Sequence, residues 1–338
     1  MQVLDLVFGL WAGGPRFFAD GWGDVAVYER LGPRVLAARK IAPARVKLGR
    51  AAPSLGGLLQ EGTFTSPERG LPKGSRTARV RLLLPRGRVR GVALYLAASG
   101  DQGFSVRLRF AAPLLERGLG ALVLENAFYG SRRPAAQHAH AVRSVRELGL
   151  MAAATLQEGR ALMRWLREVQ GIERVGVTGY SMGGQLAAMV GAATPFPVAI
   201  VPVAASFSPD SVLREGVLRN VPDWTALGGR DVRDRLLETV APFSVGALPP
   251  PVEPRAAIVV GTAFDGVVPP QEMVKLAHHW RGSELRWLPA GHVSAVLRHQ
   301  PAMREAVLDA FERLEGVRSD RRTDLRPRCG PPTAAPPQ

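Results

Sequence analysis

The chain has 338 residues, of which 46% are hydrophobic and 22% are charged. This balance excludes a disordered or fibrous protein, and the length suits one large α/β domain or two small domains. The single cysteine, Cys329, excludes an intrachain disulfide and any CxxC zinc or redox motif. No apolar run approaches the roughly 18 residues of a membrane-spanning helix.

The net charge of +15 is concentrated near the N-terminus, because residues 1–90 carry 16 basic and 6 acidic side chains. Only four of the 44 basic residues are lysine, so GC-rich coding accounts for part of the arginine content. A basic N-terminal region predicts that this part of the protein is attracted to an anionic surface. We expect a membrane surface and no nucleic acid, because zinc-finger spacing, an RNP-like strand and a basic heptad helix are all missing.

Residues 1–60 are predicted to form a helical, basic extension packed on or near the main domain. Their start resembles a signal peptide only superficially, because it lacks a basic n-region and Asp5 interrupts the apolar run. Leu4, Phe8 and Trp11 share one face at helical spacing. This face either lies on a membrane surface or packs on the domain, and both interpretations stay open.

Residues 61–316 are predicted to form one domain in which strand and helix patterns alternate. In chain order we expect strands at 77–84 and 91–98, a helix at 106–117, a strand at 120–125, a helix at 146–170, a strand at 172–178, a helix at 182–193, strands at 198–204 and 255–262, a helix at 271–280, a strand at 284–288 and a helix at 292–314. This alternation predicts a mostly parallel central sheet flanked by helices.

Two segments do not follow this alternation of strands and helices. Residues 205–254 are polar, rich in Asp and Arg, and close in ALPPPVEPR. An insertion there lies above the carboxyl edge of the sheet, where ligands enter, so we expect a short cap or lid. Residues 317–338 end in PRCGPPTAAPPQ and are predicted to be disordered.

A G-x-S-x-G motif, GYSMG, occupies residues 179–183 between a buried strand and a helix. In this context Gly179 and Gly183 permit the tight turn of a nucleophile elbow, which exposes Ser181 Oγ at the sheet edge. The alternative is a glycine-rich turn with an idle serine. A serine hydroxyl is a poor nucleophile at neutral pH, so it needs a base and a group that orients the base.

The acid and the base follow the serine in the chain order of α/β-hydrolases. Asp265 comes just after the strand at 255–262, and His292 lies between the last short strand and the last helix. We therefore predict Asp265 as the acid and His292 as the base, with Asp210 as the reserve acid. A turn aspartate and a capping histidine are the alternatives. The other five histidines are predicted to have surface roles.

Two backbone N–H groups have to face the oxyanion of a tetrahedral intermediate. One is expected from Met182, directly after the nucleophile. The other is expected from the loop after the strand at 91–98, at Ser99 and Gly100, where glycine permits close backbone approach. An ordinary β-turn is the alternative at this loop.

A second loop, ENAFYGSRRP at residues 125–134, follows a buried strand at the same edge. Tyr129, Arg132 and Arg133 are candidates for holding an anionic group such as a phosphate, and a structural hydrogen-bonding loop is the alternative. The chain contains no P-loop, no HExxH and no convincing GxGxxG. We therefore predict no metal and no cofactor.

The sequence is similar to the alpha/beta-hydrolase domain-containing protein 18 family, within the α/β-hydrolase superfamily. The match spans roughly residues 3–315 and is carried by GWGD at 21–24, LENAFYGSRRP at 124–134, TGYSMGG at 178–184, the strand end at Asp265, GHVSAVL at 291–297 and DAFERL at 309–314. The resemblance implies Ser181 as nucleophile, Asp265 as acid and His292 as base. It also implies an intracellular, lipid-acting hydrolase, with mitochondrial phospholipid deacylation as the associated activity.

The chain departs from the family pattern at two places. Relatives carry a much longer segment between about 225 and 255, so a lid deduced from them does not transfer directly. The loop after the strand at 91–98 reads YLAASGDQ at residues 95–102. It keeps Gly100 and Asp101 but lacks the two histidines that usually flank Gly-Thr-Gly-Asp in the family.

Together these features predict a serine hydrolase that cleaves a carboxylic ester through an acyl-enzyme intermediate. We expect a lipid or phospholipid acyl ester as substrate, and peripheral contact of the basic N-terminal region with an anionic membrane. Two alternatives stay open. One is a catalytically idle binding or scaffold protein, because a fold does not fix a function. The other is a serine peptidase of the same fold.

Overall fold

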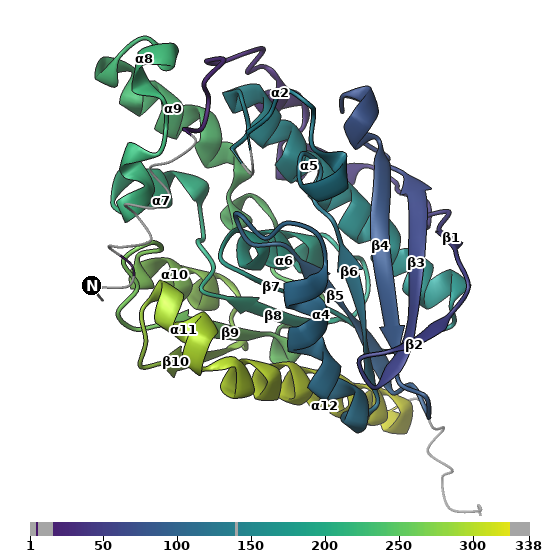
Figure 1. The fold of residues 1–338 in the computed structure, drawn as a ribbon. Coiled ribbons are helices and arrows are strands. Elements are labelled where there is room, and N and C mark those ends of the chain that lie inside the picture. The colour runs from purple at the N-terminus through teal and green to yellow at the C-terminus, as the bar shows by residue number, and fades with distance from the viewer. Residues whose placement is uncertain (1–4, 6–15, 139–140, 325–338) are drawn as a thin grey trace, which may run out of the picture.

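The computed structural model describes residues 5, 16–138 and 141–324. A central sheet is covered by helices on both faces (Figure 1). Its ten strands follow the order β1-β3-β4-β6-β5-β7-β8-β9-β10, and β2 pairs with β3. The strands are β1 Lys47–Leu48, β2 Ala52–Ser54, β3 Gly57–Thr65, β4 Thr77–Leu84, β5 Gly91–Leu96, β6 Leu119–Leu124, β7 Val175–Tyr180, β8 Ala199–Val203, β9 Ile258–Thr262 and β10 Glu284–Leu288.

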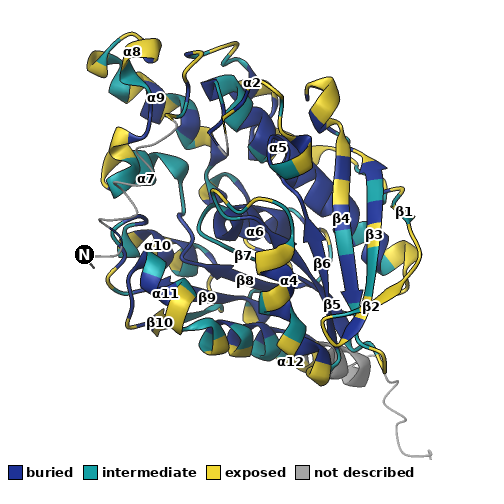
Figure 2. Cartoon of the chain, in the orientation of Figure 1, coloured by how far each residue is buried: buried dark blue, intermediate teal, exposed yellow. Residues whose placement is uncertain are grey.

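The strands from β6 across to β10 run parallel, whereas β4 and β3 are antiparallel additions at one edge. Burial explains the sequence patterns of these strands. Every residue of β5 and β6 is buried, because helices cover both faces of the parallel sheet, and both strands read as continuous apolar runs. Strand β4 alternates between exposed and buried residues along its first half. Figure 2 shows the buried centre and the exposed outer surfaces. The predicted mostly parallel α/β fold is confirmed.

Two hydrophobic clusters fill the spaces on the two faces of the sheet. Helices α5, α6 and α10 contribute to the first cluster, and α4, α11 and α12 contribute to the second. The helices of the described chain are α2 Val27–Arg30, α3 Pro33–Ala38, α4 Ser105–Ala111, α5 Val145–Arg164, α6 Met182–Ala192, α7 Pro209–Arg214, α8 Trp224–Leu227, α9 Arg233–Val240, α10 Pro270–His279, α11 His292–Arg298 and α12 Gln300–Asp324. Over these ranges no helix combines the length and the apolar character needed to cross a membrane.

Short 3-10 and π turns complete the connections. They are η1 Lys73–Ser75, η2 Ala112–Arg117, η3 Gly130–Arg132, η4 Trp165–Val169, η5 Val217–Asn220, η6 Arg230–Val232, η7 Ala241–Phe243, η8 Val245–Ala247 and η9 Pro254–Ala256. The predicted insertion at 205–254 consists mainly of such turns and of α7, α8 and α9. In Figure 1 these helices lie at the end of the molecule where the parallel strands finish.

The N-terminal region differs from the helical extension predicted for residues 1–60. Helices α2 and α3 are followed by three strands, and the expected boundary between residues 60 and 61 falls inside β3. The reason is a tight hairpin at Leu55 and Gly56, whose φ angles are 49° and 80°. Two successive positive φ angles suit a two-residue hairpin turn, which pairs β2 with β3. Leu4, Phe8 and Trp11 lie outside the described residues.

The C-terminal region differs in two ways from its prediction. The helix expected over 292–314 is divided at His299, because Pro301 has no backbone N–H to donate to the carbonyl of Leu297 and is tolerated only in the first turn of a new helix. Helix α12 then continues to Asp324, past the predicted start of disorder at residue 317. No proline precedes Pro327 in that stretch, so nothing in the sequence forces the helix to stop. Residues 325–338 lie outside the described residues.

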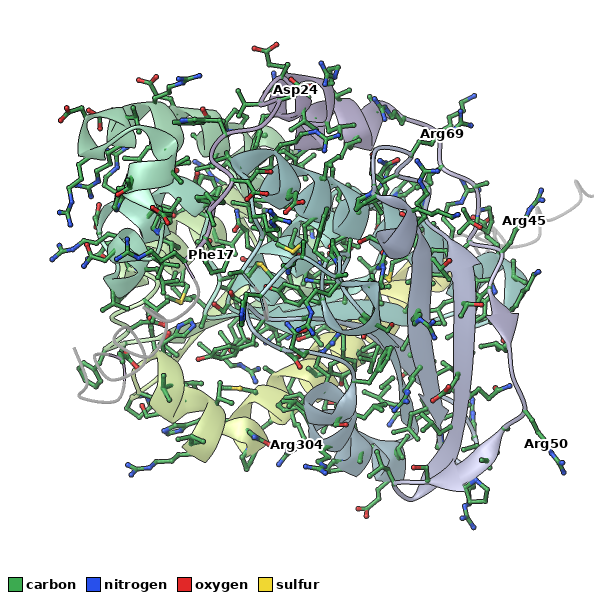
Figure 3. All side chains as sticks on the ribbon, turned by 45° about the horizontal axis from the view of Figure 1, so that its top comes forward. Phe17, Asp24, Arg45, Arg50, Arg69 and Arg304 are labelled. Carbon is green, nitrogen blue, oxygen red and sulfur yellow. The ribbon has the colours of Figure 1, made fainter. Side chains whose placement is uncertain are left out.

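Several basic side chains of the N-terminal third point into solvent at the edge formed by β1–β3. Arg45 and Arg50 are exposed, and Figure 3 shows them projecting from the opposite side of the view to Phe17. Exposed Arg69 lies on the same half of that view. These three arginines and Phe17 therefore lie on different parts of the molecule.

Candidate active site

Ser181 occupies the sharp turn between β7 and α6, with φ 57° and ψ −123°. A Cβ on Gly179 would lie 2.3 Å from the carbonyl oxygen of Gly183, and one on Gly183 would lie 2.5 Å from that of Leu96. Both positions therefore require glycine. The strained backbone directs Ser181 to the carboxyl edge of the sheet, at the N-terminus of α6. The backbone N–H of Ser181 donates to the carbonyl of Val203 at 2.9 Å, which anchors the turn to the next strand.

Ser181, His292 and Asp265 lie in one hydrogen-bonded chain. His292 Nε2 is 3.0 Å from Ser181 Oγ, and His292 Nδ1 is 2.7 Å from Asp265 Oδ2. The chain separates these residues by up to 111 positions, and the strand ends bring them together. The structure therefore gives the three residues the contacts that a nucleophile, its base and an orienting acid need.

Asp265 is held rigidly in the loop after β9. Its side chain is fully buried, and its Oδ1 accepts the backbone N–H groups of Val267 and Val268, each at 2.8 Å. The hydroxyl of Thr262 donates to the other oxygen, Oδ2. These bonds leave Oδ2 facing His292. The reserve acid, Asp210, instead contacts Ser208 and lies 3.5 Å from Arg214, and in the described part of the chain no hydrogen bond joins it to His292.

The other histidines do not join this chain of contacts in the described part of the protein. His138 and His278 are exposed, and His299 is half-buried at the junction of α11 and α12. His279 Nε2 lies 2.9 Å from the carbonyl oxygen of Leu248. His140 lies outside the described residues.

The loop after β5 contacts the N-terminus of α6, as the oxyanion prediction requires. Met182 and Ser99 both line the cavity that contains Ser181. Gly100 has a φ of 84°, and its N–H points to the hydroxyl of Tyr129 at 3.5 Å. Gly100 is therefore turned toward Tyr129, whereas Met182 and Ser99 line the cavity. As the first residue of α6, Met182 has no intrahelical acceptor for its N–H.

Tyr129 and Arg132 are built into the protein interior, which corrects their expected role in anion binding. Arg132 is fully buried, and its guanidinium makes two hydrogen bonds to Glu158, at 2.6 and 2.9 Å. A buried pair of this kind satisfies both charges and leaves no cation for a ligand. Tyr129 is also fully buried, and burial raises the pKa of its hydroxyl. Arg133 is exposed on the same loop.

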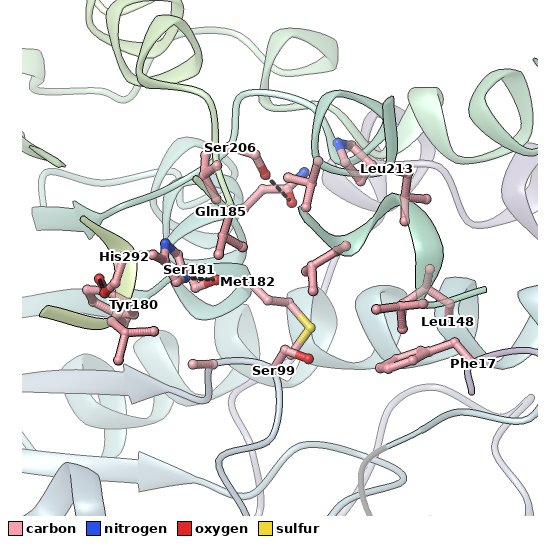
Figure 4. Close-up of a pocket in the computed structure, with 18 of the residues that line it drawn as sticks. Phe17, Ser99, Leu148, Tyr180, Ser181, Met182, Gln185, Ser206, Leu213 and His292 are labelled. Atoms are coloured by element: carbon pink, nitrogen blue, oxygen red, sulfur yellow. Dashed lines mark hydrogen bonds between the residues drawn. The ribbon is translucent and has the colours of Figure 1, made fainter. Parts of the chain in front are cut away.

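An apolar cavity of about 350 Å³ opens beside Ser181. Figure 4 shows Ser181 and His292 at one end and Phe17, Leu148 and Leu213 at the other. The N-terminal segment, α5, α7, the loop after β9 and α11 all supply walls. The apolar lining includes Phe17, Phe18, Leu148, Val212, Leu213, Leu218, Val221, Val267, Val268, Val293, Val296 and Leu297. The site therefore places a hydroxyl nucleophile at the end of a hydrophobic pocket.

A polar pair beside the nucleophile interrupts this apolar lining. Ser206 Oγ donates to Gln185 Oε1 at 3.0 Å, and Gln185 Nε2 donates to the carbonyl of Phe243 at 2.9 Å. Both side chains are thereby satisfied within the protein. Among the described residues, no group of three His, Cys, Asp or Glu side chains is arranged to hold a metal ion.

The family model named "Alpha/beta hydrolase domain containing 18" matches residues 15–241 and 229–313, which together span most of the chain. The protein belongs to this family. The family match contains the nucleophile elbow, the loop after β9 and the start of α11. The resemblance drawn from short motifs is therefore confirmed, and the family's α/β-hydrolase fold is the one observed.

Solved structures with the same fold include esterases. Acetyl xylan esterase 1 from Thermoanaerobacterium sp. JW/SL YS485 has a TM-score of 0.62 and 14% identity, and covers 92% of this chain and 99% of its own. An acetyl xylan esterase from Paenibacillus sp. R4 has a TM-score of 0.56 and 17% identity, with 89% and 99% covered. An esterase from Pyrococcus furiosus has a TM-score of 0.53 and 15% identity, with 82% and 99% covered. At these identities the likeness establishes the fold.

Sequence patterns missed two contributors to this site. Phe17 and Phe18 form part of the pocket wall, and Asp5 lies fully buried against the residues around His292. The phenylalanines gave no periodic signal. Asp5 gave one signal, a lone charge within an apolar run, which is unfavourable unless the carboxylate is satisfied by partners.

Proposed function

We propose that the protein is a serine hydrolase that cleaves carboxylic esters with an apolar acyl group. The observation that carries this proposal is the hydrogen-bonded chain from Asp265 through His292 to Ser181 at the end of an apolar cavity. Membership of an α/β-hydrolase family and the shared fold of known esterases support it. The Ser–His–Asp arrangement is the usual machinery for activating a serine toward acyl transfer.

In the first half of the proposed reaction, Ser181 Oγ attacks the ester carbonyl carbon while His292 Nε2 takes the serine proton. Asp265 keeps the Nδ1–H tautomer of His292 and stabilises the imidazolium that forms. The oxyanion faces the N–H groups of Met182 and Ser99. Collapse of the intermediate breaks the bond to the leaving alcohol, which receives the proton from His292 and leaves an acyl group on Ser181.

In the second half, His292 takes a proton from water, and the resulting hydroxide attacks the acyl carbon. A second tetrahedral intermediate collapses, Ser181 Oγ regains its proton from His292, and the carboxylic acid leaves. No metal or cofactor takes part in these steps. The reaction consumes one ester and one water and yields one alcohol and one acid.

The cavity supports a medium-length acyl chain as the group that it binds. Its volume of about 350 Å³ and its apolar lining provide room for an acyl chain longer than acetyl. The lining offers few hydrogen-bonding groups beyond Ser181, His292 and the internally satisfied pair of Gln185 and Ser206, which favours an acyl chain over a peptide backbone.

We extend the proposal to lipid esters, including phospholipids, at an anionic membrane. The exposed arginines at the β1–β3 edge support attraction to such a surface. They lie on another side of the molecule from Phe17, so we expect dissolved esters to be hydrolysed without membrane contact. A mitochondrial location, which the family resemblance suggests, would be tested by subcellular fractionation.

Acyl-chain selectivity tests the substrate part of this proposal. Across p-nitrophenyl esters from acetate to palmitate, we expect the highest kcat/KM at a medium chain length of roughly eight to ten carbons, because the pocket is apolar and limited in volume. Leu213→Trp fills part of the far end, so it should shift the optimum to shorter chains while hydrolysis of the acetate ester persists. The measurement is kcat/KM for each ester.

Val169→Trp is the matched control, because Val169 is 58% exposed and does not line the cavity. Its chain-length profile should equal that of the wild type. An unchanged profile in Leu213→Trp would contradict the assignment of this cavity to the acyl group. Hydrolysis of none of the esters by a folded wild type would contradict the proposed function and favour a binding role.

A further inference from the structure

Asp5 is a buried carboxylate that contacts both loops of the candidate active site. Its side chain has no solvent exposure. Oδ2 accepts the backbone N–H groups of Gly266 at 3.0 Å and His292 at 2.9 Å, and Oδ1 accepts that of Val293 at 2.9 Å. One side chain from the start of the sequence thus reaches residues 261 and 287 positions away.

The three N–H groups belong to the two segments that carry the acid and the base. Gly266 directly follows Asp265 in the loop after β9. His292 and Val293 are the first two residues of α11, where N–H groups have no acceptor within the helix. A carboxylate is favourable at this end of a helix, and its bonds are charge-assisted. The Asp5 carboxylate therefore fixes the backbone of the residue after the acid relative to the backbone of the base.

Tyr180 completes this arrangement from the other side of His292. Its hydroxyl donates to the backbone carbonyl of His292. Burial, and then the negative charges of Asp265 and Asp5, raise the pKa of Tyr180 well above its usual value, so the phenol stays a neutral donor. The backbone of His292 is thus held at its N–H by Asp5 and at its carbonyl by Tyr180.

We infer that Asp5 is a positioning residue for the proposed hydrolysis, which holds the base at the distance that Asp265 and Ser181 both require. This inference rests on the proposed function. Asp5 touches no substrate, because its contacts are to backbone groups behind His292. Its charge has a second effect, because a carboxylate bonded to the backbone N–H of His292 favours the imidazolium that forms when His292 takes the serine proton.

A helix cap alone explains these features less well. Serine, threonine or asparagine caps a helix without burying a charge. A fully buried carboxylate is costly unless strong hydrogen bonds compensate it. In the described part of the chain, the partners of Asp5 are all backbone N–H groups, and they join two segments that carry the acid and the base. That bridging is the function that a local cap does not provide.

The test compares Asp5→Asn and Asp5→Ala in the full chain. We expect kcat for p-nitrophenyl octanoate to fall by about 100-fold in Asp5→Ala, the size of effect that a small misplacement of a catalytic group produces. Asp5→Asn keeps one acceptor oxygen, so it should fall between Asp5→Ala and the wild type. KM should change little in either variant, because the cavity walls are unaltered.

Glu68→Ala is the matched control. Glu68 is also buried and accepts hydrogen bonds from the N–H of Gly70 and the amide of Gln157, but it does not line the cavity. It should lower the melting temperature while kcat per folded molecule stays at the wild-type value. Wild-type kcat in folded Asp5→Ala would overturn the inference, as would a loss explained wholly by the unfolded fraction.

A readout without turnover separates this inference from the proposed function. The proton shared by His292 Nδ1 and Asp265 should give a far-downfield proton resonance, assigned by its absence in His292→Ala. We expect it to be kept in Glu68→Ala, weakened in Asp5→Asn and lost in Asp5→Ala. An inactive wild type would overturn the proposed function, and an unaltered resonance in Asp5→Ala would overturn the positioning role.

Discussion

Replacement of Ser181 by alanine is expected to lower kcat for ester hydrolysis by about 10⁴-fold or more. Ser181 Oγ is the hydroxyl that contacts His292 Nε2, whereas the Tyr180 hydroxyl is bonded to the backbone carbonyl of His292, so the covalent route is lost. Alanine removes a single oxygen, so the variant should fold normally. The measurement is kcat for the octanoate ester with purified protein, alongside the melting temperature.

Ser131→Ala is the control for this variant. Ser131 donates to Glu125 in a loop away from the cavity, so its removal should leave kcat close to the wild-type value. Activity retained in Ser181→Ala at more than a few per cent would show that another residue, or another protein in the preparation, carries the hydrolysis.

Asp265→Asn is expected to lower kcat by about 10⁴-fold with little change in KM. Asparagine fits the same space, but its amide NH₂ group facing Nδ1 favours the wrong imidazole tautomer. His292 Nε2 then carries a proton and no longer serves as a base for Ser181. Steady-state kinetics of the purified variant test this expectation, with circular dichroism to verify folding.

Asp210→Asn distinguishes the two candidate acids. Among the described residues, Asp210 contacts Ser208 and Arg214 and is not hydrogen-bonded to His292, so its amide variant should keep nearly full activity. An inactive Asp210→Asn together with an active Asp265→Asn would contradict the assignment of Asp265. Asp210 would then be the acid that orients His292.

The inner strands of the sheet could be predicted from the sequence because they are buried on both faces. Continuous apolar runs such as GVALYL in β5 and LGALVL in β6 mark such strands without any tertiary information. The elbow could be predicted from its motif, in which Gly179 is required by a contact within the turn and Gly183 by the close carbonyl of Leu96 on strand β5. Chain order then indicated Asp265 and His292, because the fold brings the ends of successive strands to one edge.

Other features depend on contacts between distant segments and left little trace in the local pattern. Strand β3 is partly exposed, so its residues do not alternate cleanly, and its pairing depends on the turn at Leu55. The sequence suggested that Arg132 was available to bind an anionic group. In the structure its charge is neutralised by Glu158, 26 residues away. The role of Asp5 depends on residues more than 260 positions away, which no local pattern encodes.

Labelling with a fluorophosphonate probe tests the central claim most directly, because the probe reacts with activated serines and needs no knowledge of the substrate. We predict one covalent adduct per folded wild-type molecule, located at Ser181 by peptide mass spectrometry, and no adduct in Ser181→Ala or His292→Ala. A folded wild type that stays unlabelled, or one labelled at another serine, would contradict the account of Ser181 as a nucleophile activated by His292.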